Sequence, residues 1–322
     1  MNTSTTRREF LLQTGAVLGA PLLGCRGSTP SAGPAIIAAS VRSVEHTLAG
    51  MAMRDGAGVK VINVIGQPGL PHLDPFVLLG WFRSDDPNDY FAGFPDHPHR
   101  GFETVSFMLD GHFRHHDSHG HQGDIGPGGA QWMTAGRGIV HSEMPLQDHG
   151  LMAGFQLWLN LPAKEKWRPH EYQDLEAPLL GHARFSSGGS TVTVVAGEML
   201  GATGPARPRT TEPLLGNLWL EDDEPAELDV PHGHTAFVHV YRGAVEVGPV
   251  ASPVVVPKDT LAVLGAGTRI RLRARDGRSG VLVGAARPIG EPIVQSGPFV
   301  MNTDEEIRQA WDDYRRGVLD KV

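Results

Sequence analysis

Residues 94–145 read FPDHPHRGFETVSFMLDGHFRHHDSHGHQGDIGPGGAQWMTAGRGIVHSEMP and contain half of the 16 histidines in the chain. Two short patterns stand near the ends of this stretch, HPH at 97–99 and HSE at 141–143. In an extended strand, residues two apart point to the same face, and Pro98 favours extended backbone at the residue before it. Two such strands facing each other inside a small barrel would direct three imidazoles and one carboxylate to one point. We therefore predict a metal site formed by His97, His99, His141 and Glu143.

The donor set limits the kind of metal. Imidazole and carboxylate without thiolate suit a borderline divalent ion, and they disfavour an iron–sulfur cluster or a thiolate zinc site. We expect one ion of Fe²⁺, while Mn²⁺, Ni²⁺, Cu²⁺ and Zn²⁺ are compatible with the same donors. A single histidine in a polar segment is more often a surface residue, but two pairs on one face are harder to explain in that way.

Other residues of this stretch allow more than one interpretation. Glu103 is an even number of residues from His97 and His99, so in extended backbone it would face the same side. It could be a fifth ligand, a carboxylate that orients an imidazole, or a structural carboxylate. We favour the orienting role. Further histidines surround the turn-forming residues 117–120, which predicts a solvated loop, with a pocket rim as the alternative; they are His115, His116, His119 and His121. Candidate pocket walls, most of which core packing would also explain, are Phe94, Phe102, Trp132, Met144 and Phe155.

The composition predicts an all-β fold. The chain has 322 residues with Gly 41 and Pro 25, and most of its hydrophobic runs are short and end at these residues. Such a length is typical of about two domains. The net charge of −8 argues against a nucleic-acid partner, which would require a basic surface.

The first residues have the layout of an export signal. Residues 1–25 combine a charged start with a short apolar run and small residues before Cys25, the only cysteine. TRREFL at 6–11 resembles the twin-arginine motif and LLGC at 22–25 resembles a bacterial lipobox. We therefore expect twin-arginine export to the periplasm, with Cys25 as a lipidation site that could anchor the protein to a membrane surface.

The remaining chain divides into a tether and two domains. Residues 26–40 are rich in Ser, Pro, Gly and Ala, as flexible tethers are. A change of pattern near 171–180 separates an N-terminal metal-binding domain, 41–175, from a C-terminal domain, 176–322, in which we expect no metal. A capping box at 303–306 predicts that the second domain ends in a helix.

Four motifs resemble those of the pirins, a family of bicupins. They are DPF at 74–76, FPDHPHRGFETV at 94–105, QWMTAGRGIVHSEMP at 131–145 and EPIVQSGPFVMNT at 291–303. The resemblance implies two tandem cupin domains, which are antiparallel β-barrels, with metal only in the first. It also implies His97, His99, His141 and Glu143 as metal ligands, the same four that the alternation of side chains along a strand selects. Glu103 falls where many cupins have a carboxylate ligand, which pirins do not use.

The resemblance also implies an activity. The leading hypothesis is a dioxygenase resembling quercetin 2,3-dioxygenase, which opens the heterocycle of a flavonol or another enol-bearing aromatic with O₂ and releases carbon monoxide. In it Glu143 accepts the proton of the substrate hydroxyl. A second hypothesis is a non-catalytic, metal-binding or redox-responsive module that docks on a protein partner at the cell envelope. A cupin-type isomerase or a zinc hydrolase is a third.

Overall fold

This computed structural model describes residues 39–207, 209–221 and 223–321. The predicted export signal at 1–25, the lipidation site Cys25 and positions 26–38 of the tether lie outside the described residues. The backbone N–H of Ser40 donates to Thr268 Oγ1 at 3.1 Å, so ordered contacts begin close to the predicted start of folded sequence.

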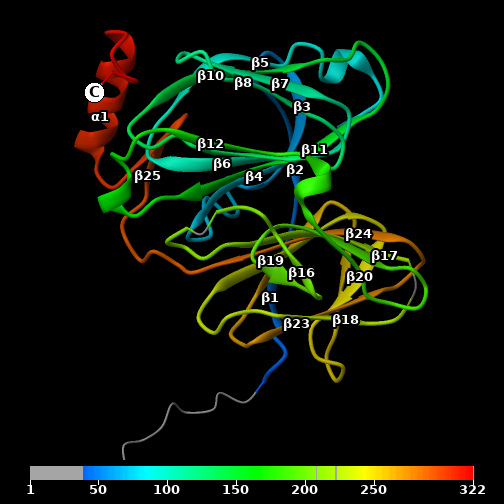
Figure 1. The fold of residues 1–322 in the computed structure, drawn as a ribbon. Coiled ribbons are helices and arrows are strands. Elements are labelled where there is room, and N and C mark those ends of the chain that lie inside the picture. Colours follow the sequence, from blue (N-terminus) through cyan, green and yellow to red (C-terminus); the bar gives the residue numbers. More distant parts are fainter. Residues whose placement is uncertain (1–38, 208, 222, 322) are drawn as a thin grey trace, which may run out of the picture. The chain divides into compact units, whose positions relative to one another are not determined.

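The first half of the chain forms two antiparallel sheets (Figure 1). One has seven strands in the order β12 (Glu171–Leu175), β9 (Ala130–Thr134), β6 (Phe102–Asp110), β11 (Met152–Asn160), β4 (Phe76–Ser84), β3 (Val59–Ile65) and β2 (Met51–Asp55). The other has four strands in the order β5 (Phe94–His99), β10 (Ile139–Pro145), β7 (Phe113–Asp117) and β8 (Gln122–Ile125). Together they make the first cupin barrel.

The second half repeats this arrangement. Its seven-stranded sheet has the order β1 (Val44–Ala49), β22 (Thr260–Leu264), β19 (Thr235–Arg242), β24 (Ser279–Ala286), β17 (Leu214–Leu220), β14 (Thr191–Ala196) and β13 (Gly181–Arg184). Its four-stranded sheet has the order β18 (Ala226–Asp229), β23 (Arg269–Ala274), β20 (Ala244–Val247) and β21 (Val254–Pro257). The two-stranded pairs are β15 (Glu198–Met199) with β16 (Ala202–Thr203), and β25 (Val294–Ser296) with β26 (Phe299–Met301). The prediction of an all-β chain with two cupin domains is confirmed.

Aromatic side chains join the two barrels in one hydrophobic cluster. The ring of Phe76 on β4 meets that of Phe237 on β19 edge to face at 5.0 Å. Trp81, also on β4, lies 5.1 Å from Tyr241. Because aromatic rings bury large apolar areas, these contacts stabilise the pairing of the barrels.

Contacts cross the expected boundary between 41–175 and 176–322 at both ends of the chain. Strand β1 pairs with β22 of the second barrel. In return, the segment 294–319, which we call the C-terminal strap, packs on the first barrel. The buried Arg100 guanidinium next to β5 is 2.7 Å from Asp313 of the strap.

The strap contains the predicted helix, α1 (Asp304–Arg315). Thr303 caps it and Glu306 completes the capping box, as the sequence predicts. Figure 1 shows α1 in red next to β25, with which it is in contact. Within the described residues, no helix is both long and apolar enough to cross a membrane.

Candidate metal centre and cavity

Two neighbouring strands bring three histidines together. His97 and His99 lie on β5 and His141 on β10, and His141 is directly opposite His97 in the antiparallel register. The ring centroids are 4.7 Å apart for His97 and His99, 4.3 Å for His97 and His141, and 4.9 Å for His99 and His141. One nitrogen from each ring lies within 4.8 Å of the others, so these three side chains could hold a metal ion.

In each imidazole, Nδ1 already has a hydrogen-bond partner. His97 Nδ1 is 2.9 Å from the Pro95 carbonyl and His99 Nδ1 is 3.3 Å from the Pro298 carbonyl. His141 Nδ1 is 3.1 Å from Nδ1 of His115. This arrangement leaves Nε2 of each ring for a metal, since ligating histidines usually donate their other nitrogen to a neighbouring acceptor.

The state of the rings fits a divalent metal. His141 Nε2 is buried and has no hydrogen-bond partner among the described residues. Burial, followed by the nearby imidazoles, lowers the pKa of both His99 and His141 well below the usual range. The rings of His99 and His141 are therefore neutral at ordinary pH, and neutral imidazole is the form that binds metals.

Glu143 is near this cluster but outside the group that the three rings form. The register between β5 and β10 shifts here, with the extra residue on β5. Strand β10 stays in regular register with β7, so Glu143 keeps the face of His141. Ser106 Oγ donates to Oε1 of Glu143 at 2.6 Å, and Gln156 Nε2 donates to Oε2 at 2.8 Å. Burial raises the pKa of this carboxyl, although the Ser106 hydrogen bond and the charge of His97 oppose the rise.

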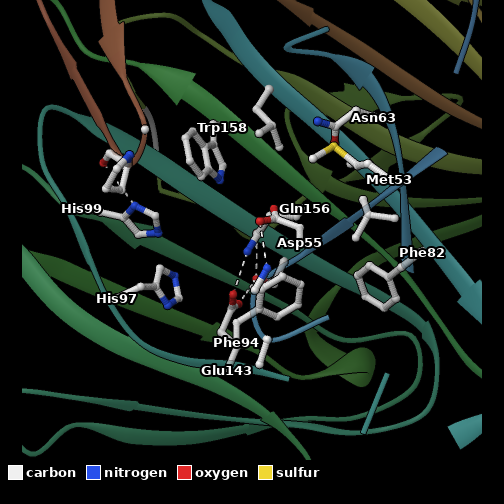
Figure 2. Close-up of a pocket in the computed structure, with 18 of the residues that line it drawn as sticks. Met53, Asp55, Asn63, Phe82, Phe94, His97, His99, Glu143, Gln156 and Trp158 are labelled. Carbon is white, nitrogen blue, oxygen red and sulfur yellow. Dashed lines mark hydrogen bonds between the residues drawn. The ribbon is translucent and has the colours of Figure 1, made fainter. Parts of the chain in front are cut away.

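A cavity of about 600 Å³ opens beside the histidines, and His97, His99 and Glu143 contribute to its wall (Figure 2). This volume is typical of sites for small organic molecules, which span about 300–1,000 Å³. Most of the wall is apolar: Met53, Val61, Leu78, Phe82, Phe94, Phe113, Phe155 and Trp158. Pro298 of the C-terminal strap closes part of it, so both ends of the fold contribute to the site.

Only two of the five predicted pocket residues line the cavity. Phe94 and Phe155 line the cavity. Phe102 is fully buried behind it, with its ring 5.0 Å from that of His99. Trp132 is buried in the hydrophobic core, and Met144 is half-buried outside the cavity wall.

Glu103 has partners of its own. It accepts a hydrogen bond from Thr134 Oγ1 at 2.6 Å and forms an ion pair with Arg209 Nε at 3.0 Å. Burial raises its pKa, and the Arg209 charge opposes this. These contacts make Glu103 a structural carboxylate and not the orienting carboxylate that we favoured. No imidazole among the described residues hydrogen bonds to it.

One residue was misjudged from the sequence. We predicted a solvated loop for the histidines around 117–120, and residues 118–120 do form an exposed turn. However, β7 extends through His115 to Asp117, and His115 is fully buried. Its burial lowers its pKa to about 4. The alternation of Phe113, His115 and Asp117 was the signal that could have revealed a strand with these side chains inside.

Comparisons with known proteins agree with this architecture. The family profile described as Pirin matches residues 58–159, and the Pirin C-terminal cupin domain matches residues 216–320. A Pseudomonas aeruginosa protein provisionally named as a quercetin 2,3-dioxygenase is 46% identical over 285 residues, which cover 86% of this chain and 98% of that protein. Human Pirin is 42% identical over 266 residues, covering 81% of this chain and 88% of its own length. The crystal structure of quercetin 2,3-dioxygenase from Acinetobacter baumannii superposes with a TM-score of 0.80 at 34% identity, covering 87% of this chain and 99% of that one.

Proposed function

The chain belongs to the pirin family, and on that premise we propose that it is a metal-dependent dioxygenase of flavonols or related enol-bearing aromatics. The reaction would open the heterocycle with O₂ and release carbon monoxide. The observation that carries the proposal is the group of three imidazoles, two of which, His97 and His99, contribute to the wall of a largely apolar cavity of about 600 Å³. The names of the relatives from Pseudomonas aeruginosa and Acinetobacter baumannii support the reaction class.

His97, His99 and His141 would hold the metal through Nε2, because Nδ1 of each ring is engaged elsewhere. We expect Fe²⁺, although the donors also suit the neighbouring divalent ions. When bound, such an ion supplies Lewis acidity and a redox partner for O₂.

The protein groups around it would position the substrate and take up its proton. The apolar walls exclude water and match the planar surface of an aromatic molecule. Glu143 would accept the proton of the substrate hydroxyl at a carboxylate oxygen, and Ser106 and Gln156 hold that carboxylate in place. Glu143 as a fourth metal ligand stays a prediction.

Oxygen uptake on addition of quercetin tests the proposal. Mature protein would be reconstituted in parallel with Fe²⁺, Mn²⁺, Ni²⁺, Cu²⁺ and Zn²⁺. We expect uptake with at least one redox-active ion and none with Zn²⁺. Metal binding without uptake for any ion would contradict the enzyme and favour the docking module.

Variants of the site separate the roles of its residues. His141→Ala should lose both metal and activity, whereas His116→Ala, which removes an exposed imidazole from the neighbouring strand, should lose neither. Glu143→Ala should lose activity, and its metal content decides whether Glu143 is also a ligand. Full metal content and full activity in His141→Ala would contradict the site.

We also propose, from the sequence alone, that residues 1–25 direct twin-arginine export and that Cys25 is lipidated. Mass spectrometry of the mature N-terminus from a membrane fraction tests this. Intact residues 1–24, or an unmodified Cys25, would contradict the lipid anchor.

A further inference from the structure

A row of polar residues crosses the inner face of the seven-stranded sheet in the first barrel. Direct register partners on adjacent strands share one face of a sheet. Following these partners from strand to strand gives Asn63 on β3, Gly80 on β4, Gln156 on β11, Ser106 on β6, Gln131 on β9 and Asp174 on β12. The first four of these residues line the cavity.

Asn63 differs from the other polar side chains in this row. Ser106 Oγ donates to Glu143 Oε1 at 2.6 Å, and Gln131 Nε2 donates to Asp174 Oδ1 at 2.7 Å. Asn63 is only 7% exposed, yet none of the described residues forms a hydrogen bond with its side-chain amide. The amide borders the cavity without a protein partner, so it is available to hydrogen bond a ligand that occupies the cavity.

Gly80 leaves space between Asn63 and Gln156. A Cβ atom at position 80 would lie 3.6 Å from Asn63 Oδ1 and 3.1 Å from Val61 Cγ1. Because glycine has no such atom, the cavity reaches across Gly80 to the amide of Asn63. The neighbouring wall at Val61 and Leu78 is apolar and offers the amide no alternative partner.

Figure 2 shows Asn63 and Met53 on the side of the cavity away from His97 and His99. A substrate whose enol edge faces the histidines would therefore direct its other end toward Asn63.

We propose that Asn63 is a specificity-determining residue that hydrogen bonds a hydroxyl or carbonyl group on the part of the substrate remote from the metal. This inference rests on the proposed function. It narrows the substrate class to flavonols or similar aromatics that carry a polar substituent remote from the enol edge that faces the histidines. An amide can both donate and accept, so either substituent can pair with it.

Binding, measured without turnover, tests this inference. Protein loaded with Zn²⁺, which has no redox chemistry, would be titrated without air by following tryptophan fluorescence. Three ligands share the same 3-hydroxy-4-keto edge: 3-hydroxyflavone, 3,5,7-trihydroxyflavone and 3,3′,4′-trihydroxyflavone. Asn63→Leu should weaken at least one of the two trihydroxylated ligands about 10-fold and leave 3-hydroxyflavone within about twofold of its native affinity. The ligand that loses affinity identifies the ring that reaches Asn63.

Leu78→Ala is the matched control, because it alters the same wall without removing a polar group, and it should weaken all three ligands alike. Asn63→Ala replaces Asn63→Leu if the larger side chain prevents folding. Equal losses for all three ligands, or no loss for any, would overturn the role of Asn63 and leave the proposed function standing. If the native protein binds none of the three, the proposed function fails and this inference fails with it.

Discussion

Removal of the His115 imidazole should weaken metal binding while the barrel stays folded. His115 is fully buried, and its Nδ1 is 3.1 Å from Nδ1 of His141. A metal on Nε2 of His141 requires the proton of that ring to be on Nδ1, so Nδ1 of His115 must be the acceptor. We therefore assign His115 the role of fixing the tautomer and orientation of His141.

The expected loss follows from what each substitution leaves behind. In His115→Leu, the N–H of His141 stays buried without an acceptor, which costs about 1–3 kcal/mol. Loss of such outer partners usually lowers metal affinity about 10- to 100-fold, or about 1.4–2.7 kcal/mol. In His115→Asn, the side-chain Oδ1 can take the place of the ring nitrogen, so the affinity should stay within about threefold of native.

Competition against a chromophoric chelator, with Zn²⁺ as the probe ion, measures these affinities. His116→Leu is the matched control, because it removes an exposed imidazole from the adjacent position of the same strand. Thermal unfolding of the metal-free variants reports whether each one is folded. Native affinity in a folded His115→Leu protein would contradict this role of His115, as would equal losses in the Leu and Asn variants.

Three further predictions concern stability, each measured by denaturant unfolding. Burial lowers the pKa of His239 to about 4, so below about pH 6.5 the unfolded chain takes up a proton that the native ring does not. The free energy of unfolding should therefore fall by about 3 kcal/mol as the pH is lowered from about 6.5 to about 4. His239→Leu should flatten that dependence, and an unchanged slope would contradict this. Arg100→Met leaves Asp313 buried without its cation and should cost about 3–5 kcal/mol; a loss under about 1 kcal/mol would argue against a buried ion pair. Thr303→Ala removes the cap of α1 and should cost about 1 kcal/mol, whereas a neutral result would mean that the cap contributes nothing.

Local rules predicted the histidine cluster and the terminal helix. His97 and His99 are two residues apart in a strand, and alternation alone places them on one face. The capping box from Thr303 to Glu306 is likewise a signal contained in four residues. Both features depend only on near neighbours in the chain, which a single sequence displays.

The same rule places Glu143 on the face of His141. Both side chains are buried on either side of the half-buried Ser142, and β10 keeps a regular register with β7. The partners of the carboxylate, Ser106 and Gln156, come from two other strands. Such partners depend on how strands pair, so the spacing of residues does not show them.

Long-range pairing explains what else the sequence did not show. Strand β1 pairs with β22 more than two hundred positions later, and no local pattern indicates that exchange. His115 was assigned to a loop because turn-forming residues follow it, whereas its partner His141 is 26 positions away. Phe155 and Trp132 belong to the same hydrophobic cluster, and only the fold shows that Phe155 also lines the cavity.

The stoichiometry of the reaction tests whether this protein opens the flavonol heterocycle with O₂. Protein loaded with its working metal would be sealed with a flavonol, and O₂ consumed, flavonol lost and carbon monoxide released would be measured together. We expect the three amounts to be equal and His141→Ala to abolish all of them. Flavonol loss without O₂ uptake and carbon monoxide release, or equal turnover in the His141→Ala protein, would contradict it.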